Sequence, residues 1–381
     1  MEPLGIYLHV PFCTAKCPYC DFYSLGTQAM TDAEEVMDAY VDAMLRELAQ
    51  WGQRLECRQA DTVYFGGGTP LLLGSRRISR LLQGVRAAFA LTQQAEITLE
   101  ANPATALAQE FSRLHEAGVN RLSFGLQSSC EEELRLLGRR HTAQQAAQCV
   151  LDAQAAGFTN LSLDLMLGLP GQSEQTIADS IAFCSSLNVP HISAYLLKVE
   201  PGTPFQQQGI QALCPDEDTQ ADWYLLAVQS LARHGYRQYE ISNFSRSPET
   251  QSRHNLKYWR CQEYLGLGPS AHSFLNGSRM YYPRDLDSFL TGAGSPGYLP
   301  VPDGEGGGFE EAVLLGLRLN EGISLRELGA RFPQADCAQL ARRATPLRRA
   351  GLLEEGEDRL ALTPRGFLLS NSIITKLLYG V

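Results

Sequence analysis

The stretch PFCTAKCPYCDFYSL, residues 11–25, follows an apolar run at the amino terminus and holds Cys13, Cys17 and Cys20 in a CxxxCxxC spacing. Phe22 stands where a further cysteine would extend the set. Three cysteines so close together cannot all pair in disulfides, so metal binding is the simpler interpretation. Structural zinc sites have four ligands, and no second CxxC or HxxxH motif follows that could complete such a site. Iron-sulfur clusters also usually take four cysteines, so three would leave one iron open to a small molecule.

Composition and charge are those of an ordinary globular protein. Of 381 residues, 44% are hydrophobic and 19% are charged, which suits one large domain and a smaller one. No apolar run reaches the roughly 18 residues of a membrane span. The amino terminus lacks the pattern of a secretory signal, so we expect a cytoplasmic protein. A net charge of −10 opposes general binding to nucleic acid.

Six apolar runs, each followed by a helical pattern, predict the architecture. The predicted strands are GIYLHV (5–10), TVYFG (62–66), EITLEA (96–101), RLSFGLQ (121–127), LSLDLMLG (161–168) and HISAYLLK (191–198). The predicted helices cover 31–52, 75–90, 104–117, 131–157 and 173–187. Six βα units in succession predict an α/β protein with a parallel sheet, either a partial barrel or an open doubly wound sheet.

Polar residues and glycines gather where the predicted strands end. GGGTP (66–70) follows the second strand, and Glu100, Gln127 and Asp164 lie near the ends of the third, fourth and fifth. Because the carboxyl ends of strands form the active face of βα folds, we expect one pocket. The glycines fit either a tight turn or a close approach to a ligand. The carboxylates fit either structural ion pairs or a cationic or hydroxyl-bearing ligand, and Arg139 is a candidate carboxylate partner.

CTAKCPYC together with GGGTP after the second strand resembles the radical S-adenosylmethionine (SAM) superfamily. The resemblance implies a 4Fe-4S cluster on the three cysteines, with SAM chelating the open iron. It also implies a set of residues that contact SAM or lie beside it: Tyr7, Tyr19, Gly67, Gly68, Thr69, Glu100, Gln127, Arg139 and Asp164. In a working radical enzyme of this kind, an electron from the cluster cleaves SAM to methionine and a 5′-deoxyadenosyl radical, which implies an electron donor.

Longer motifs narrow the resemblance. IYLHVPFC, YFGGGTP, LEANP, RLSFGLQS, DLMLGLPGQ, HISAYLLKVEPGTP and YLGLGPSAHSF resemble the oxygen-independent coproporphyrinogen III oxidase family, which adopts a partial (β/α)6 barrel. Its oxidase branch, which converts propionates to vinyls, typically has a cysteine at the position of Phe22 and a longer amino-terminal segment. Its HemW-type heme chaperone branch carries CDF and HNxxYW motifs, and this chain has both. That branch implies heme as cargo and apo-hemoproteins as acceptors, and it leaves a homodimer open.

His254 in RHNLKYWR is the candidate heme ligand, with Tyr258 and Trp259 as a flanking aromatic wall. The alternative for a lone histidine is an interface residue satisfied by local hydrogen bonds. His272 in GPSAHSF is a second candidate, whose glycine-rich setting also suits a structural turn.

A segment rich in glycine and proline at 292–308 predicts a linker between a barrel domain and its extension over 1–291 and a second domain over 309–381. The second domain is predicted to contain three or four helices and a small strand pair around DRLALT. This resembles the carboxy-terminal helical, winged-helix-like domain of the same family. From residue 301 onward, ten Lys or Arg stand against eleven Asp or Glu, so we predict no nucleic-acid partner.

Overall fold

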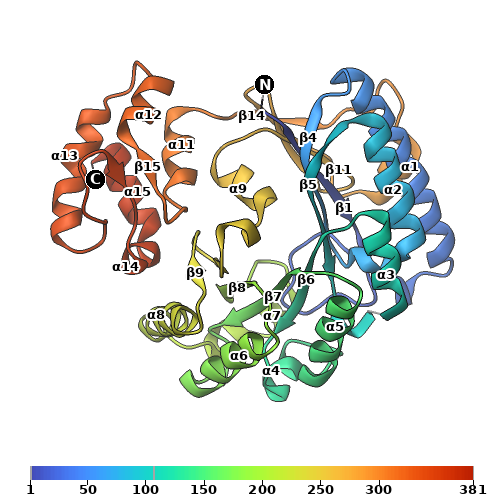
Figure 1. Ribbon diagram of the computed structural model, residues 1–381, viewed down its shortest axis with the longest axis horizontal. Helices are drawn as coiled ribbons and strands as arrows, with labels where there is room; N and C mark the ends of the chain where they lie inside the picture. Colours follow the sequence, from blue (N-terminus) through green and yellow to red (C-terminus); the bar gives the residue numbers. More distant parts are fainter. Residues whose placement is uncertain (1, 106–107, 381) are drawn as a thin grey trace.

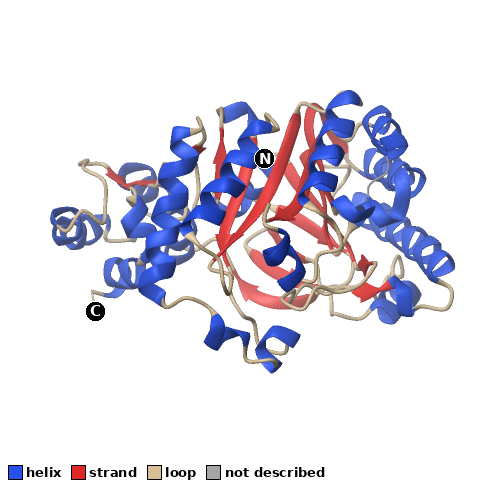
Figure 2. Ribbon diagram, turned by 90° about the horizontal axis from the view of Figure 1, so that it is seen from below, coloured by secondary structure: helices blue, strands red, loops and turns tan. Residues whose placement is uncertain are grey.

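The computed structural model describes residues 2–105 and 108–380. In this part of the chain, 12 strands form one curved sheet (Figures 1 and 2). Its centre is a run of six parallel neighbours: β1 (Leu4–Val10), β4 (Gln59–Gly67), β5 (Ala90–Ala101), β6 (Arg121–Gln127), β7 (Asn160–Leu167) and β8 (His191–Leu196). These strands confirm the six predicted ones and the partial barrel, although β5 begins earlier than its apolar run.

Further strands extend both edges of the central six. On one side, β11 (Tyr264–Leu267) pairs parallel with β1 and is followed outward by antiparallel β12 (His272–Leu275), β13 (Ser278–Tyr281) and β14 (Val301–Glu305). On the other side, β10 (Asn243–Ser245) and β9 (Arg237–Gln238) follow β8. Two short strands, β2 (Phe12–Cys13) and β3 (Leu25–Gly26), pair apart from this sheet and bracket the cysteine loop.

Helices flank the sheet along the chain (Figure 1). They are α1 (Ala33–Arg54), α2 (Gly74–Ala88), α3 (Ala108–Ala117), α4 (Glu131–Leu136), α5 (Ala143–Ala155), α6 (Glu174–Ser186), α7 (Pro204–Gln207), α8 (Glu217–Arg233), α9 (Arg253–Trp259) and α10 (Leu286–Gly292). The apolar faces of most of these helices join the strands in a core whose members, such as Ile6, Phe65 and Leu82, are fully buried. None of the described helices is long and apolar enough to cross a membrane.

The helix predicted over 131–157 is wrong as one element, because two helices, α4 and α5, occupy it. Gly138 adopts a φ of +66° just after α4, a conformation that ends a helix. Thr142 then caps α5 by accepting a hydrogen bond from the backbone N–H of Gln145 at 3.1 Å. The break places Arg139 in a loop. Of the helix predicted over 104–117, residues 106 and 107 lie outside the described part.

The predicted linker over 292–308 contains strand β14, which pairs with β13. All five residues of β14 are exposed, so the strand has no buried apolar period that the sequence could reveal. Main-chain hydrogen bonds hold it instead. The division into 1–291, 292–308 and 309–381 remains our proposal for the domains.

The carboxy-terminal segment packs a second apolar core. It comprises α11 (Phe309–Gly316), α12 (Leu325–Arg331), α13 (Cys337–Arg349), α14 (Pro364–Leu368) and α15 (Ser370–Tyr379), with β15 (Ile323–Ser324) paired to β16 (Arg359–Leu360). The predicted strand pair is therefore present. The described part has one helix more than the three or four predicted, because the last helical stretch divides at Leu369 into α14 and α15.

A buried carboxylate ties α1 to the segment after β13. Glu47 has no exposed surface. It accepts hydrogen bonds from the Trp51 indole N–H at 3.1 Å, the Tyr282 hydroxyl at 2.5 Å and the Gly294 N–H at 2.7 Å. One side chain thus satisfies donors from segments far apart in the sequence.

Replacing Glu47 by alanine is expected to lower the free energy of unfolding by about 3 kcal/mol, because buried donors lose their acceptor. Thermal unfolding followed by circular dichroism measures the change. The matched variant Glu35→Ala alters an exposed residue of the same helix and should change stability by less than about 0.5 kcal/mol. Equal unfolding temperatures for the two variants would contradict this role of Glu47.

Candidate functional site

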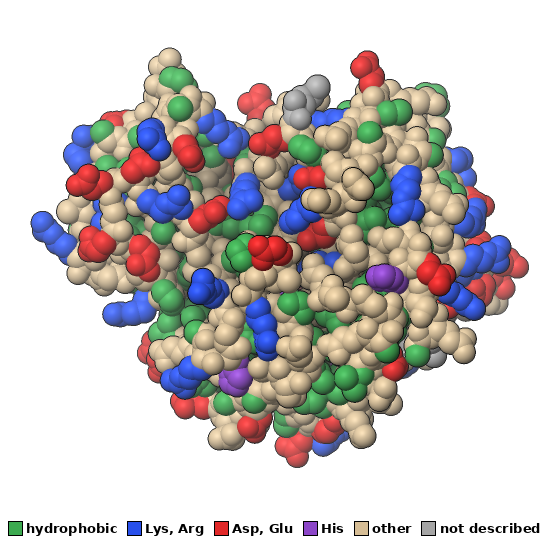
Figure 3. All heavy atoms as spheres, viewed as in Figure 1, with side chains coloured by type: hydrophobic (Ala, Val, Ile, Leu, Met, Phe, Trp, Pro, Cys, Tyr) green, Lys and Arg blue, Asp and Glu red, His purple; other side chains and the backbone are tan. Residues whose placement is uncertain are grey.

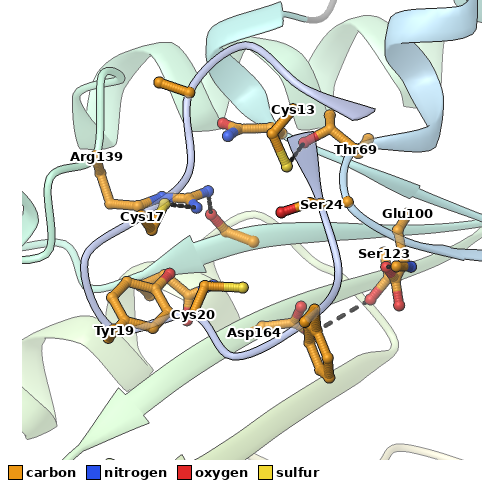
Figure 4. A pocket seen from close by; sticks show the side chains of 18 of the residues that line it. Cys13, Cys17, Tyr19, Cys20, Ser24, Thr69, Glu100, Ser123, Arg139 and Asp164 are labelled. Carbon is orange, nitrogen blue, oxygen red and sulfur yellow. Dashed lines mark hydrogen bonds between the residues drawn. The ribbon is translucent and has the colours of Figure 1, made fainter. Parts of the chain in front are cut away.

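A hollow with about 780 Å³ of empty space, open to solvent, lies at the carboxyl ends of the central strands (Figure 4). It is lined by Cys13, Ala15, Cys17, Tyr19, Cys20, Phe22, Ser24, Gly67, Gly68, Thr69, Glu100, Ala101, Asn102, Ser123, Gly125, Gln127, Arg139, Asp164 and Tyr195. The structure therefore brings together the three cysteines of the CxxxCxxC motif and every predicted SAM residue except Tyr7.

The cysteine loop lies across one side of the hollow, and its thiols meet donors from other segments of the chain. The Thr69 hydroxyl donates to Cys13 Sγ at 3.6 Å, and Arg139 Nη1 donates to Cys17 Sγ at 3.6 Å (Figure 4). Burial is the main cause that raises the pKa of Cys13, and it raises the pKa of Cys20 to about 11. These two thiols therefore keep their protons at neutral pH unless a positive centre stabilises the thiolates.

The three thiols share one hollow without forming a site for a single metal ion. Within residues 2–105 and 108–380, no group of three or more His, Cys, Asp or Glu side chains is placed to hold one ion. All ten cysteines are free, and the other seven do not line the hollow.

Two glycines at the end of β4 make room for the protein's own atoms: Gly67 is the last residue of the strand, and Gly68 follows it. A Cβ on Gly67, whose φ is +110°, would lie 2.5 Å from the His9 ring, and a Cβ on Gly68 would lie 2.5 Å from the carbonyl oxygen of Phe12. The Gly67 N–H donates to Glu100 Oε2 at 3.2 Å. Tight packing against these protein atoms is a structural reason for glycine at both positions. A close approach of their backbone to a ligand stays a prediction.

Two half-buried carboxyl groups face the hollow from β5 and β7, which lie on either side of β6. Glu100 accepts a hydrogen bond from the Tyr64 hydroxyl at 2.7 Å, and Asp164 accepts one from the Ser123 hydroxyl at 3.2 Å. Burial raises the pKa of Glu100 to about 7 and also raises the pKa of Asp164. No Lys, Arg or His in the described chain forms an ion pair with either group. The arrangement therefore favours a cationic or hydroxyl-bearing ligand over structural ion pairs.

The sequence interpretation missed several lining residues, among them Ser123, Gly125 and Tyr195. The first two alternate with Gln127 along β6, so they face the same side of the strand. Tyr195 on β8 donates from its hydroxyl to Gln127 Oε1 at 3.0 Å. The alternation of side chains along a strand could have revealed the two residues on β6. Once Gln127 is expected to face the pocket, the residues two and four positions before it are expected to face it as well.

For Tyr7, a place beside SAM stays a prediction. The residue does not line the hollow, because it stands three residues before the end of β1 and so lies deeper in the barrel. Its hydroxyl donates to His9 Nδ1 at 3.0 Å, while His9 Nε2 donates to the Tyr23 carbonyl at 2.8 Å. Its ring centroid lies 6.1 Å from that of Tyr64.

His254 is an interface histidine whose two ring nitrogens both form hydrogen bonds inside the protein, and its role as a heme ligand stays a prediction. The residue is fully buried, with Nδ1 2.8 Å from Thr62 Oγ1 and Nε2 2.8 Å from the Tyr258 hydroxyl. Burial lowers its pKa to about 3. In this structure neither ring nitrogen is free to bind iron.

The other heme candidates lie in different surroundings. Tyr258 packs edge-on against Tyr264 with ring centroids 4.5 Å apart, and Trp259 packs against a small apolar cluster, so neither forms an open wall beside His254. His272 is exposed, stacks on Tyr281 at 5.5 Å and has Nδ1 3.9 Å from Asp303. Of the two candidate histidines, only His272 is accessible to solvent.

Comparisons with known proteins agree with the fold and with the hollow. The Radical SAM superfamily description matches residues 7–184, and the HemN C-terminal domain description matches residues 309–369. The solved coproporphyrinogen III oxidase HemN from Escherichia coli is similar over 100% of this chain and 91% of that chain, with a TM-score of 0.84 and 23% identity. That likeness shows the fold alone. The class is therefore a radical SAM protein with a carboxy-terminal domain of the HemN type.

Relatives with higher identity identify the family. The protein named "Heme chaperone HemW" in Mycobacterium tuberculosis is 37% identical over an alignment of 386 positions, gaps included, that covers 99% of this chain and 95% of the relative. The protein of the same name in Escherichia coli is 41% identical over 272 residues, 71% of this chain and 70% of the relative. The chain belongs to the HemW family.

Proposed function

We propose that the protein is a radical SAM heme chaperone that binds a 4Fe-4S cluster, SAM and heme, and delivers heme to apo-hemoproteins. One observation carries this proposal. A hollow with three cysteine thiols and two carboxyl groups that form no ion pair among the described residues lies in a chain that is similar, over almost its whole length, to a protein named heme chaperone.

The residues around the hollow fit a cluster. Cys13, Cys17 and Cys20 would hold three of its irons, and the hydrogen bonds from Thr69 and Arg139 favour the thiolate forms that bind metal. Iron would also offset the burial that keeps the free thiols protonated. When bound, the cluster would supply an electron and one open iron position.

The same wall fits the charges of SAM. Glu100 and Asp164 would face its cationic and hydroxyl groups, and Gly67, Gly68 and Thr69 would hold the amino end of its methionine portion. Arg139 would face its carboxylate, and its buried Nε has no protein partner among the described residues. Tyr19 would lie beside the adenine and Gln127 would complete the wall. The role of these residues would be to bind and orient SAM and to limit the access of water to it.

Phe22 is the feature that separates the chaperone from the alternative oxidase. Its side chain is 65% exposed at the rim of the hollow, where the oxidase branch typically carries a further cysteine. We therefore do not propose decarboxylation of a porphyrinogen as the main activity. An electron donor is a partner only if SAM is cleaved.

Proteins and heme, not nucleic acids, are the partners that we propose. On the face shown in Figure 3, basic and acidic side chains are interspersed over the carboxy-terminal segment and the barrel. A mixed surface of this kind creates no positive field to attract phosphates. A homodimer remains among the proposed assemblies.

The test is an anaerobic heme titration of cluster-reconstituted protein, followed by the Soret band. Saturable one-to-one binding is the expected result. Parallel titrations of His272→Ala and His254→Ala assign the ligand: a change confined to His272→Ala identifies the exposed imidazole, and one confined to His254→Ala means that α9 opens to admit heme. Absence of saturable binding, together with carbon dioxide release from coproporphyrinogen III, SAM and a reductant, would favour the oxidase instead.

A further inference from the structure

The short helix α9 is anchored to the sheet at its first residues. It lies between the central strands and the carboxy-terminal helices (Figure 1). The carboxylate of Glu96, which is only 5% exposed, accepts hydrogen bonds from the backbone N–H groups of Arg253 and His254, each at 3.0 Å. A buried carboxylate on β5 therefore fixes the start of α9, and with it the position of the His254 ring.

The His254 ring holds the ring of Tyr64 in place. Hydrogen bonds to Thr62 and Tyr258 fix both nitrogens of the imidazole, so the ring cannot rotate freely. It stacks on the Tyr64 ring with centroids 5.1 Å apart and an interplanar angle of 29°. Tyr64 thus meets a rigid surface supplied by α9.

Tyr64 connects the His254 ring to the wall of the hollow through its hydrogen bond with Glu100. Its hydroxyl donates to Glu100 Oε1 at 2.7 Å, and the other carboxylate oxygen accepts from the Gly67 N–H at 3.2 Å. Glu100 lines the hollow, whereas Tyr64 and His254 do not. A continuous set of contacts therefore runs from α9 to a ligand-facing carboxylate.

We propose that His254 and Tyr64 are positioning residues for Glu100, so that α9 sets the affinity of the hollow for SAM. This inference rests on the proposed function, which assigns SAM to the hollow. It gives buried His254 a role that needs no contact with heme.

The charge on Glu100 makes the inference measurable. The titratable groups that interact electrostatically with this carboxyl come from several elements: Tyr7, Tyr64, Arg121, Asp164 and Tyr258. Burial raises the pKa of Glu100 to about 7, and the hydrogen bond from Tyr64 opposes that rise. Loss of the Tyr64 hydroxyl therefore raises this pKa further, and the carboxylate form that attracts a cation is lost at a higher pH as the solution is acidified.

The experiment is calorimetric titration of anaerobic, cluster-reconstituted protein with SAM, repeated between about pH 6 and pH 9. Tyr64→Phe keeps the stacked ring and removes only the hydroxyl. We expect roughly tenfold weaker binding at neutral pH, the factor for one hydrogen bond to a charged group, and an upward shift of the pH at which affinity is half lost. The matched control is Tyr236→Phe, whose buried hydroxyl donates to the Val189 carbonyl away from the hollow and whose loss should leave both quantities unchanged.

A pair of variants at His254 tests the stacking step. His254→Phe keeps a flat ring against Tyr64 and should retain most of the affinity for SAM, whereas His254→Ala removes the ring and should weaken binding in the same direction as Tyr64→Phe. The inference is overturned if Tyr64→Phe binds SAM within twofold of the unaltered protein with the same pH profile. If the unaltered protein does not bind SAM, the proposed function fails and this inference fails with it.

Discussion

Replacing Cys17 by alanine is expected to abolish the brown chromophore of the reconstituted protein and to reduce its bound iron and sulfide to background. The thiol lines the hollow with Cys13 and Cys20, and no other cysteine of the chain lies there to replace it. Iron-sulfur clusters depend on thiolate ligands, and a cluster already short of one protein ligand loses a second. Ultraviolet-visible and electron paramagnetic resonance spectra, with iron and sulfide analysis, measure the loss.

Two measurements separate ligand loss from unfolding. Cys17 is only partly buried and lies in a loop, so the metal-free variant should unfold within about 0.5 kcal/mol of the metal-free parent. Cys57→Ala, a change at an exposed cysteine away from the hollow, should keep the full chromophore. A complete 4Fe-4S signal in Cys17→Ala would show that the ligand assignment is wrong.

Replacing Gly68 by alanine is expected to weaken SAM binding by roughly tenfold to a hundredfold, the range that corresponds to an overpacking cost of about 1–3 kcal/mol. The added Cβ would lie 2.5 Å from the carbonyl oxygen of Phe12 and 2.9 Å from its carbonyl carbon. That carbonyl also accepts the Thr69 N–H at 2.6 Å. Because backbone cannot rotate away as a side chain can, the glycine-rich loop must move relative to the cysteine loop.

Calorimetric titration with SAM measures this effect, and iron analysis of the same samples shows whether the cluster itself is retained. Gly297→Ala is the matched control, since a Cβ there would meet no atom within 4 Å. Its SAM affinity should equal that of the parent. An unchanged affinity in Gly68→Ala would mean that the loop does not contribute to the SAM site.

Local patterns allowed much of the fold to be predicted. The six central strands can be recognised in the sequence as short apolar runs. The residues at their carboxyl ends lie on one rim because parallel strands run in the same direction. β14 and the break between α4 and α5 were not predicted. The first has only exposed side chains, and the second depends on a left-handed glycine and a helix cap inside a continuous apolar period.

The sequence by itself determined the six βα units, the three cysteines and the glycine-rich loop of the hollow, because each is a pattern among residues close together in the chain. Only the tertiary structure decided that His254 is sealed inside the protein, since its partner Thr62 lies 192 positions away. The same holds for Tyr195, which meets Gln127 across 68 positions. Burial and hydrogen bonding at such separations depend on how strands and helices pack against one another, and local periodicity carries no record of that packing.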